Sequence, residues 1–162
     1  MMNITYFSLG TNLGNRLKNI ENALICIREL GDIQKLSSVY NTKPWNVNEK
    51  QPDYLNQNCQ LITELSPQEL INRTKNIEIN LGRTNKRDKT SRIIDIDLLL
   101  YGDLILNSEN LVIPHPQMTE RAFVMIPLAE IVPDLTISGY KKSVKEIANG
   151  LDSSLVEIFL ES

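Results

Sequence analysis

Residues 92–101 read Arg-Ile-Ile-Asp-Ile-Asp-Leu-Leu-Leu-Tyr, a short apolar segment that carries two aspartates two positions apart. In a β-strand alternate side chains share a face, so Asp95 and Asp97 would lie side by side, about 7 Å apart. The other face of the strand would be apolar throughout, formed by Ile94, Ile96, Leu98 and Leu100. A strand that is largely apolar on both faces is typical of the centre of a sheet.

Two adjacent carboxylates are costly to bury, because each loses its hydration and each repels the other. A divalent cation removes both penalties, and Mg²⁺ commonly binds one or two carboxylates together with waters and substrate phosphates. The residues therefore predict a metal site at Asp95 and Asp97. The alternative is a strand end at which both aspartates reach solvent or pair with arginines.

The charged residues are unevenly distributed. The chain carries a net charge of −3, yet residues 83–92 hold five basic side chains against one acidic side chain. General nucleic-acid binding usually needs a broad basic face, which this chain lacks. The cluster fits a loop that gathers phosphates locally, and a solvated charged loop is the simpler alternative.

The chain has 162 residues, of which 41% are hydrophobic and 23% charged. These values predict one globular domain over residues 1–162 and exclude collagen, coiled coil and general disorder. No apolar run approaches the roughly 20 residues that span a bilayer, and residues 1–4 lack the basic start of a signal peptide. Cys26 and Cys59 lie in apolar segments without a pairing pattern. We therefore expect a cytoplasmic protein without membrane contact.

Hydrophobic periodicity predicts the order of the elements. Residues 3–9 are β-branched and aromatic, which indicates a strand ended by Gly10. Helical spacing over residues 13–31 predicts a helix, and the capping box Ser66-Pro67-Gln68-Glu69 opens a second one that ends at Gly82. Further elements are expected as strands at 36–42, 54–63 and 93–101, a hairpin at 104–113, a helix from Thr119 that Pro127 curtails, and a helix at 142–149.

This order, β-α-β-β-α-β followed by a C-terminal extension, predicts an α+β fold with a ferredoxin-like split βαβ sheet and helices packed on one face.

Two further groups of residues suggest a site. Tyr54 and Asn56 share a strand face and place an aromatic ring beside a carboxamide, which suits the edge of a planar heterocycle. His115, the single histidine, is held between two prolines in a rigid, non-helical segment. Each pattern also occurs in purely structural positions, and Phe123 is by default a core residue.

Taken together, these segments resemble the 6-hydroxymethyl-7,8-dihydropterin pyrophosphokinase family of folate biosynthesis. The resemblance covers about residues 3–135, and Arg92-Ile93-Ile94-Asp95-Ile96-Asp97 matches the family signature Arg-x-x-Asp-x-Asp. The other matching blocks follow in family order at residues 9–14, 40–44, 51–56, 77–83, 113–116 and 121–133.

The resemblance implies an enzyme that transfers the diphosphate of ATP to the hydroxymethyl group of the pterin and releases AMP. It implies that Asp95 and Asp97 hold two Mg²⁺ ions and that Arg83 and Arg92 are catalytic. It assigns ATP binding to Lys75, Glu78, Leu98, His115 and Arg121. It assigns pterin binding to Thr42, Lys43, Pro44, Trp45, Tyr54, Asn56 and Phe123, with the ring between Tyr54 and Phe123.

One segment departs from the family pattern, because Lys89-Thr90-Ser91 stands where the family often has Trp-Gly-Pro. Two rival functions are a paralogue that binds ATP or pterin without turnover and an RNA-binding ferredoxin-like module. The pI of about 5.2 and the 6% of aromatic residues argue against the RNA-binding module, which needs a basic sheet face with aromatic side chains that stack on bases. A monomeric enzyme with ATP and the pterin as its ligands is the expectation.

Overall fold

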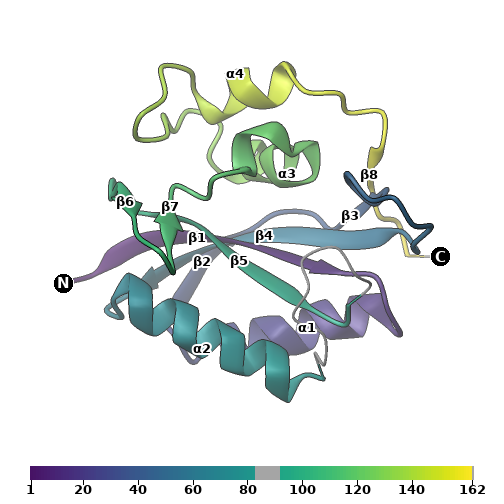
Figure 1. The fold of residues 1–162 in the computed structure, drawn as a ribbon, viewed down its shortest axis with the longest axis horizontal. Helices are drawn as coiled ribbons and strands as arrows, with labels where there is room; N and C mark the ends of the chain where they lie inside the picture. Colours follow the sequence, from purple (N-terminus) through teal and green to yellow (C-terminus); the bar gives the residue numbers. More distant parts are fainter. Residues whose placement is uncertain (83–91, 162) are drawn as a thin grey trace.

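The computed structural model describes residues 1–82 and 92–161 (Figure 1). Its centre is an antiparallel sheet in the order β5-β1-β4-β3-β8, with β2 also paired to β4. The strands are β1 (Asn3–Thr11), β2 (Asp32–Leu36), β3 (Tyr40–Thr42), β4 (Tyr54–Thr63), β5 (Asp95–Tyr101) and β8 (Val156–Ile158). This is the predicted split βαβ arrangement, and the C-terminal extension adds β8 to it. The predicted fold class is confirmed.

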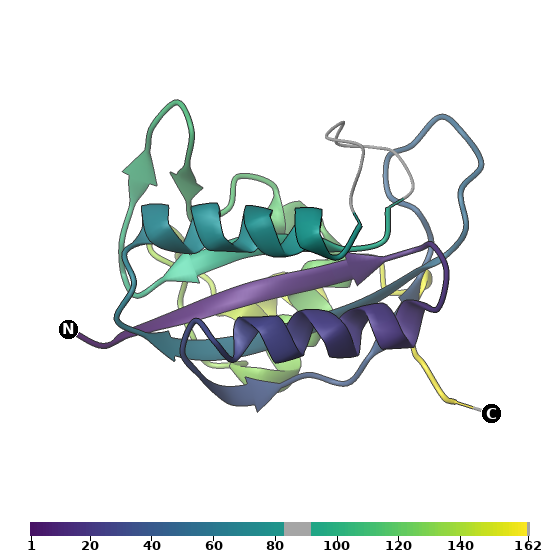
Figure 2. The same ribbon diagram turned by 90° about the horizontal axis from the view of Figure 1, so that it is seen from below.

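The helices cover both faces of the sheet, so the expectation of one covered face is wrong (Figure 1). On one face α1 (Arg16–Ile27) and α2 (Pro67–Asn80) lie side by side (Figure 2). On the other face lie the 3₁₀ turn η1 (Met118–Glu120), α3 (Ala122–Ile131) and α4 (Val144–Asn149). The sheet is apolar on both faces at one end, and a single layer of helices would leave that second face in water.

The face under α1 and α2 is a continuous apolar core. Phe7, Leu9 and Leu61 of the sheet are fully buried there against residues of both helices such as Ile20 and Leu70. The capping box predicted for α2 is present, since the Ser66 N–H donates to Glu69 Oε2 at 2.8 Å and the Glu69 N–H donates to Ser66 Oγ at 3.3 Å. The two helices are thus placed by local signals and held by burial.

The face under α3 and α4 carries a second core, which includes Leu99, Met125 and Leu128. The helix expected from Thr119 begins at Ala122 instead, and Pro127 lies inside it without ending it. Proline removes one backbone hydrogen bond, but the burial of Met125 and Leu128 on either side of it keeps the helix on the sheet. Among the described residues, no helix combines the length and the apolar composition that crossing a membrane requires.

Strand β5 differs from its prediction in two ways. It lies at the edge of the sheet rather than at its centre, because within residues 1–82 and 92–161 β1 is the one strand that pairs with it. It also contains a bulge, since Phe7 faces Leu98 and Tyr6 faces Leu100, which leaves Leu99 as an extra residue. The bulge reverses the alternation, so Leu98 points into the α1–α2 core whereas Leu99 and Leu100 both join the α3–α4 core.

Two other boundaries differ from the expectation. Strand β1 continues through Gly10 to Thr11. Of the strand expected at 36–42 only β3 is present at its end, and β2 lies almost wholly before that range, where no strand was predicted. The break between β2 and β3 is at Ser37, whose hydroxyl accepts from the Asn58 N–H at 2.9 Å and whose carbonyl accepts from Gln57 Nε2 at 2.7 Å. Side chains thus satisfy the backbone where the ladder stops. The expected hairpin is confirmed as β6 (Leu106–Asn107) and β7 (Val112–Ile113).

Candidate active site

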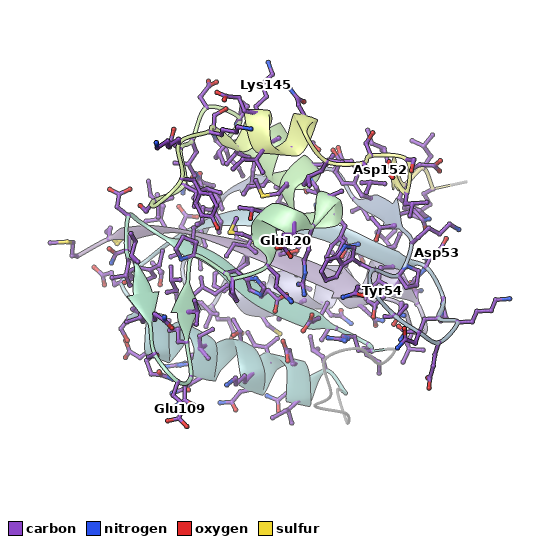
Figure 3. All side chains as sticks on the ribbon, turned by 45° about the horizontal axis from the view of Figure 1, so that its top comes forward. Asp53, Tyr54, Glu109, Glu120, Lys145 and Asp152 are labelled. Carbon is purple, nitrogen blue, oxygen red and sulfur yellow. The ribbon has the colours of Figure 1, made fainter. Side chains whose placement is uncertain are left out.

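A cleft of about 380 Å³ opens on the side of the sheet that also carries α3. Its floor comes from β1, β3, β4 and β5, and one wall comes from the start of α3. Figure 3 shows Tyr54 at the end of the molecule opposite the β6–β7 hairpin, whose tip carries Glu109. The cleft lining includes Ser8, Gly10, Thr42, Lys43, Trp45, Val47, Tyr54, Asn56, Arg92, Asp95, Asp97, His115, Pro116, Gln117, Arg121 and Phe123.

Asp95 and Asp97 face the cleft together, as the strand alternation predicts. Arg92 Nη1 lies 3.1 Å from Asp95 Oδ2, so the arginine pairing that was the alternative to a metal is present for this residue. Asp97 has weaker partners, with Arg121 Nη1 at 3.8 Å and His115 Nε2 at 4.0 Å from its Oδ2. Burial and the Asp95 carboxylate raise the pKa of Asp97 to about 8.

This donor set fits a divalent cation. Both carboxylates line the cleft, and the raised pKa of Asp97 shows that nearby arginines do not offset its burial and the repulsion from Asp95. In the parts of the chain that the structure describes, no cluster of three or more His, Cys, Asp or Glu residues could form a closed metal cage. Mg²⁺ does not need one, because waters and substrate phosphates complete its shell.

Glu78 holds the backbone between the two aspartates. It comes from α2, is only 7% exposed, and its Oε1 accepts from the Ile96 N–H at 2.8 Å. The carboxylate therefore covers an outward-facing amide of the edge strand β5, and it also contributes to raising the pKa of Asp97. The family resemblance assigns Glu78 to ATP, which stays a prediction, and in the structure its carboxylate fixes the strand that carries the aspartates.

Arg92 is placed by Asn12, which follows β1. The Arg92 N–H donates to Asn12 Oδ1 at 2.8 Å, the Asn12 N–H donates to the Arg92 carbonyl at 3.1 Å, and Asn12 Nδ2 donates to the Pro52 carbonyl at 3.2 Å. The Arg92 side chain is 9% exposed and lies at the cleft. Asn12 thus ties three segments together at the rim. Arg83 and the Lys89-Thr90-Ser91 segment lie outside the described residues.

His115 presents a neutral ring to the cleft. The backbone N–H of His115 donates to the Leu99 carbonyl at 2.9 Å. The ring Nδ1 accepts from the Gln117 backbone N–H at 3.2 Å. The accepting Nδ1 places the single ring proton on Nε2, the nitrogen that faces Asp97. Burial, followed by the charge of Arg121, lowers the pKa of His115 to about 4. His115 is therefore an uncharged hydrogen-bond donor at neutral pH.

Arg121 reaches the cleft over two aromatic rings that touch each other. Its guanidinium carbon lies 5.0 Å from the centre of the Trp45 ring and 5.6 Å from that of Phe123. Nη2 donates to Gln117 Oε1 at 2.5 Å, whereas Nε is buried and has no hydrogen-bond partner among the described residues. A buried donor without a partner is costly, so this nitrogen favours an acceptor brought by a ligand.

The other end of the cleft suits a flat ring. Asn56 is 3% exposed and its Nδ2 donates to Thr42 Oγ1 at 2.5 Å. A Cβ at Gly10 would lie 2.9 Å from Asn56 Oδ1, so glycine is required for this carboxamide to stay in place. Tyr54 and Phe123 line the same cleft, which places aromatic surface beside a fixed carboxamide as the sequence predicted.

The structure brings most of the predicted site residues to one cleft, with four exceptions in the described chain. Leu98 is 3% exposed in the α1–α2 core, and Lys75 is exposed on α2. Glu78 acts through the β5 backbone, and Pro44 is not among the lining residues. Sequence reasoning missed Ser8 and Gln117. Ser8 could have been found from the polar alternation of Ser8 and Gly10 on one face of β1.

A model of the 7,8-dihydro-6-hydroxymethylpterin-pyrophosphokinase family matches residues 6–133. The chain belongs to this family. A 2-amino-4-hydroxy-6-hydroxymethyldihydropteridine pyrophosphokinase from Aquifex aeolicus is 38% identical over 145 residues, which cover 90% of each chain. The protein of that name from Haemophilus influenzae is 35% identical over 155 residues and covers 94% of this chain and 96% of its own. The predicted pyrophosphokinase family and enzyme class are thereby confirmed.

Longer relatives also contain this pyrophosphokinase region. The folic acid synthesis protein fol1 of Pneumocystis carinii is 44% identical over 131 residues, and the match spans 80% of this chain but only 18% of that protein. A crystal structure of Plasmodium falciparum HPPK-DHPS superimposes with a TM-score of 0.77 at 16% identity, over 93% of this chain and 45% of that one. This likeness shows the fold.

Proposed function

We propose that the cleft transfers the diphosphate of ATP to the hydroxymethyl group of 6-hydroxymethyl-7,8-dihydropterin, giving the pterin diphosphate and AMP in folate biosynthesis. Membership of the pyrophosphokinase family supports this reaction. The observation that carries it in this chain is one cleft that joins a carboxylate pair, Asp95 and Asp97, to the aromatic and amide groups of Tyr54, Asn56 and Phe123.

In the reaction the hydroxyl oxygen of the pterin forms a bond to the β-phosphorus, and the bond from that phosphorus to the α–β bridging oxygen breaks. AMP leaves with the electron pair of the broken bond, and the hydroxyl proton is released. Little covalent chemistry is left for the protein, so catalysis rests on alignment and on stabilisation of charge.

The polar end of the cleft supplies donors for the phosphates. Arg92 and Arg121 bring two positive charges, and His115 Nε2, which lies 4.0 Å from Asp97 Oδ2, brings a neutral donor. These groups are preorganised. Asn12 fixes the Arg92 backbone and Asp95 pairs with its guanidinium, while Gln117 binds Arg121 and His115. We assign Arg83 to the same phosphates by its place in the family pattern, together with Arg92.

The aromatic end orients the acceptor. The pterin lies between Tyr54 and Phe123, and its pyrimidine edge meets Asn56 and the backbone of residues 42–45. The carboxamide of Asn56 presents a donor and an acceptor together, and its Nδ2 is already fixed by Thr42. This placement holds the hydroxymethyl group toward the phosphates, since the aspartates border the same floor.

An ATP-dependent kinase requires a divalent metal. We propose that Asp95 and Asp97 hold two Mg²⁺ ions, which would neutralise phosphate charge and align the phosphates when bound. The raised pKa of Asp97 supports this assignment, because a cation nearby would favour the ionised carboxylate.

We also predict a monomer, a single domain over residues 1–162 and a cytoplasmic location. Light scattering during size-exclusion chromatography tests the first of these.

The deciding experiment is product identification. The protein is incubated with ATP, Mg²⁺ and 6-hydroxymethyl-7,8-dihydropterin, and nucleotides and pterins are separated by ion exchange. AMP and pterin diphosphate in equal amounts are expected. Intact ATP with unmodified pterin, despite binding of both, would overturn the proposal in favour of a binding protein. A filter-binding assay with single-stranded RNA at low salt should show no retention.

A further inference from the structure

Trp45 stands between the two ends of the cleft. It lies on the loop between β3 and β4 and lines the cleft opposite the start of α3. Its ring meets Phe123 edge to face, with centroids 6.4 Å apart and planes at 63°. Its face also lies under the guanidinium of Arg121 at 5.0 Å. One side chain therefore contacts both the proposed wall of the pterin site and a proposed phosphate donor.

The indole fixes Arg121 in a way that the rest of the site does not. Gln117 holds one terminal nitrogen of the guanidinium, and Phe123 covers it at 5.6 Å. Asp97 is 3.8 Å away, which is long for a charge-assisted hydrogen bond. The Trp45 and Phe123 rings meet edge to face and the guanidinium lies over both of them, where cation–π attraction resists its moving away. The buried Nε is then aimed by the rings rather than by a polar partner.

The loop that carries Trp45 is clamped at its ends. Asp53 Oδ2 accepts from Lys43 Nζ at 2.8 Å and from Asn41 Nδ2 at 3.2 Å, and the Asp53 carbonyl accepts from Arg16 Nη1 at 3.0 Å. Asn46, which directly follows Trp45, has a left-handed backbone with φ of 51°. The clamp and the turn set the direction of the indole relative to α3.

We propose that the Trp45 side chain is a positioning residue that acts through Arg121. It orients the guanidinium for the phosphates and ties that orientation to the wall of the pterin site through Phe123. This inference rests on the proposed function. The earlier assignment of Trp45 concerns its backbone at the pterin edge, whereas here the indole itself sets the rate of transfer.

The first test compares Trp45→Ala with Trp45→Phe in steady-state assays. We expect Trp45→Ala to lower kcat about tenfold and to raise the KM for pterin by a smaller factor, because the lost contact orients a group that acts on the transferring phosphate. Trp45→Phe should recover most of kcat. Lys50→Ala, on the same loop and outside the cleft lining, controls for a general loop disturbance. A rise in KM with unchanged kcat would overturn the proposal.

The second test asks whether Trp45 acts through Arg121. In an Arg121→Ala background, Trp45→Ala should cost less than about twofold in kcat, because the group it positions is gone. Equal losses in both backgrounds would contradict the proposal. Circular dichroism and thermal melting show whether each variant folds, and Trp45→Leu, which is apolar but has no ring, replaces Trp45→Ala if that variant does not fold.

The third test uses Trp45 as its own probe, because it is the single tryptophan of the chain. Adding ATP and Mg²⁺ without pterin should change the tryptophan emission as the guanidinium over the ring engages phosphate. At saturating nucleotide the change should at least halve in Arg121→Ala. A full response in that variant, or none in the unmodified protein, would overturn the inference. Turnover by the unmodified protein separates this outcome from failure of the proposed function.

Discussion

The two faces of the sheet are built from the same strands and behave differently. The face under α1 and α2 is closed by helices of 12 and 14 residues, and it buries Phe7, Leu9 and Leu61 completely. On the opposite face α3, of 10 residues, packs on the strands, and α4, of 6 residues, packs mainly on α3, so this face is covered only in part (Figure 1). The uncovered part is polar and carries the cleft. Burial on one face stabilises the fold, so the other face is free to hold groups that are costly to bury.

The largest expected effect separates chemistry from stability on the open face. Asp97→Ala should lower turnover by about 10³-fold or more, because it removes a charged ligand at the reacting phosphates. The melting temperature of the metal-free protein should not fall. Product assays and thermal unfolding measure both quantities. Near-normal turnover would disprove the two-carboxylate site.

The pH dependence of the same residue gives a second readout. The pKa of Asp97 in the folded protein, about 8, lies above its value of 3.8 in an unfolded chain, so the folded state retains a proton that the unfolded state has lost. Stability of the metal-free protein should therefore fall as the pH rises from about 4 to about 8. Asp97→Asn should weaken this dependence of stability on pH. An unchanged dependence would contradict the raised pKa of Asp97.

A matched change on the face under α1 and α2 should lower stability and leave turnover nearly unchanged. Phe7→Ala should reduce the free energy of unfolding by about 3–5 kcal/mol, because Phe7 is fully buried and the space cannot refill. The kcat per folded molecule should stay close to normal. Ile25→Ala, at a site that is 57% exposed on α1, should cost less than about 0.5 kcal/mol. Urea unfolding with active-site titration distinguishes these outcomes.

Glu78 tests whether the two faces are independent. It belongs to α2 of the closed face but binds the Ile96 N–H between the two aspartates. Glu78→Ala should lower kcat about tenfold and raise the Mg²⁺ concentration needed for half-maximal rate, since the strand loses an anchor. Glu78→Gln keeps a carbonyl acceptor and should be affected less. Equal losses in the two variants would indicate that the charge, not the strand anchor, matters.

The smallest effect concerns His115, the single histidine of the chain. Its NMR titration should have a midpoint well below the usual 6.5, near 4, because burial and Arg121 disfavour the charged ring. Between about pH 6.5 and 4 the unfolded chain binds a proton at His115 that the folded protein does not. The stability of the protein should therefore fall as the pH falls through this range. In Arg121→Ala the midpoint should rise. A midpoint near 6.5 in the unmodified protein would refute the neutral-donor role.

The closed face could be predicted almost entirely from the sequence. The capping box at Ser66 and the 54–63 strand were placed correctly, because local signals and period-two alternation act within a few residues. The site was also largely predictable once Asp95, Asp97 and their flanking motifs were seen together. What failed on β5 was the alternation beyond Leu98, because a bulge depends on the partner strand β1 and leaves no mark in the local pattern.

Other errors have the same origin in distant contacts. Pro127 was expected to end a helix, yet its place in α3 is decided by the burial of its neighbours on the sheet. The hydrogen bond of Glu78 to the Ile96 N–H likewise depends on where α2 meets β5, and the assignment of Glu78 to ATP stays a prediction. The stacking of Trp45 on Arg121 joins residues 76 positions apart in the sequence, and nothing local to either residue announces it.

Strand β8 has a consequence for how the molecule meets its neighbours in concentrated solution. It pairs with β3 from Tyr40 to Thr42, and Phe159 beyond it packs against the α1–α2 core. Without β8, the unpaired backbone of β3 would be open to strands of other molecules, which is a common start of aggregation. The strand that replaces it as the edge is three residues long with Glu157 at its centre. A strand of three residues with a charge at its centre is a poor template for further pairing, so β8 covers the β3 edge without offering an equal one.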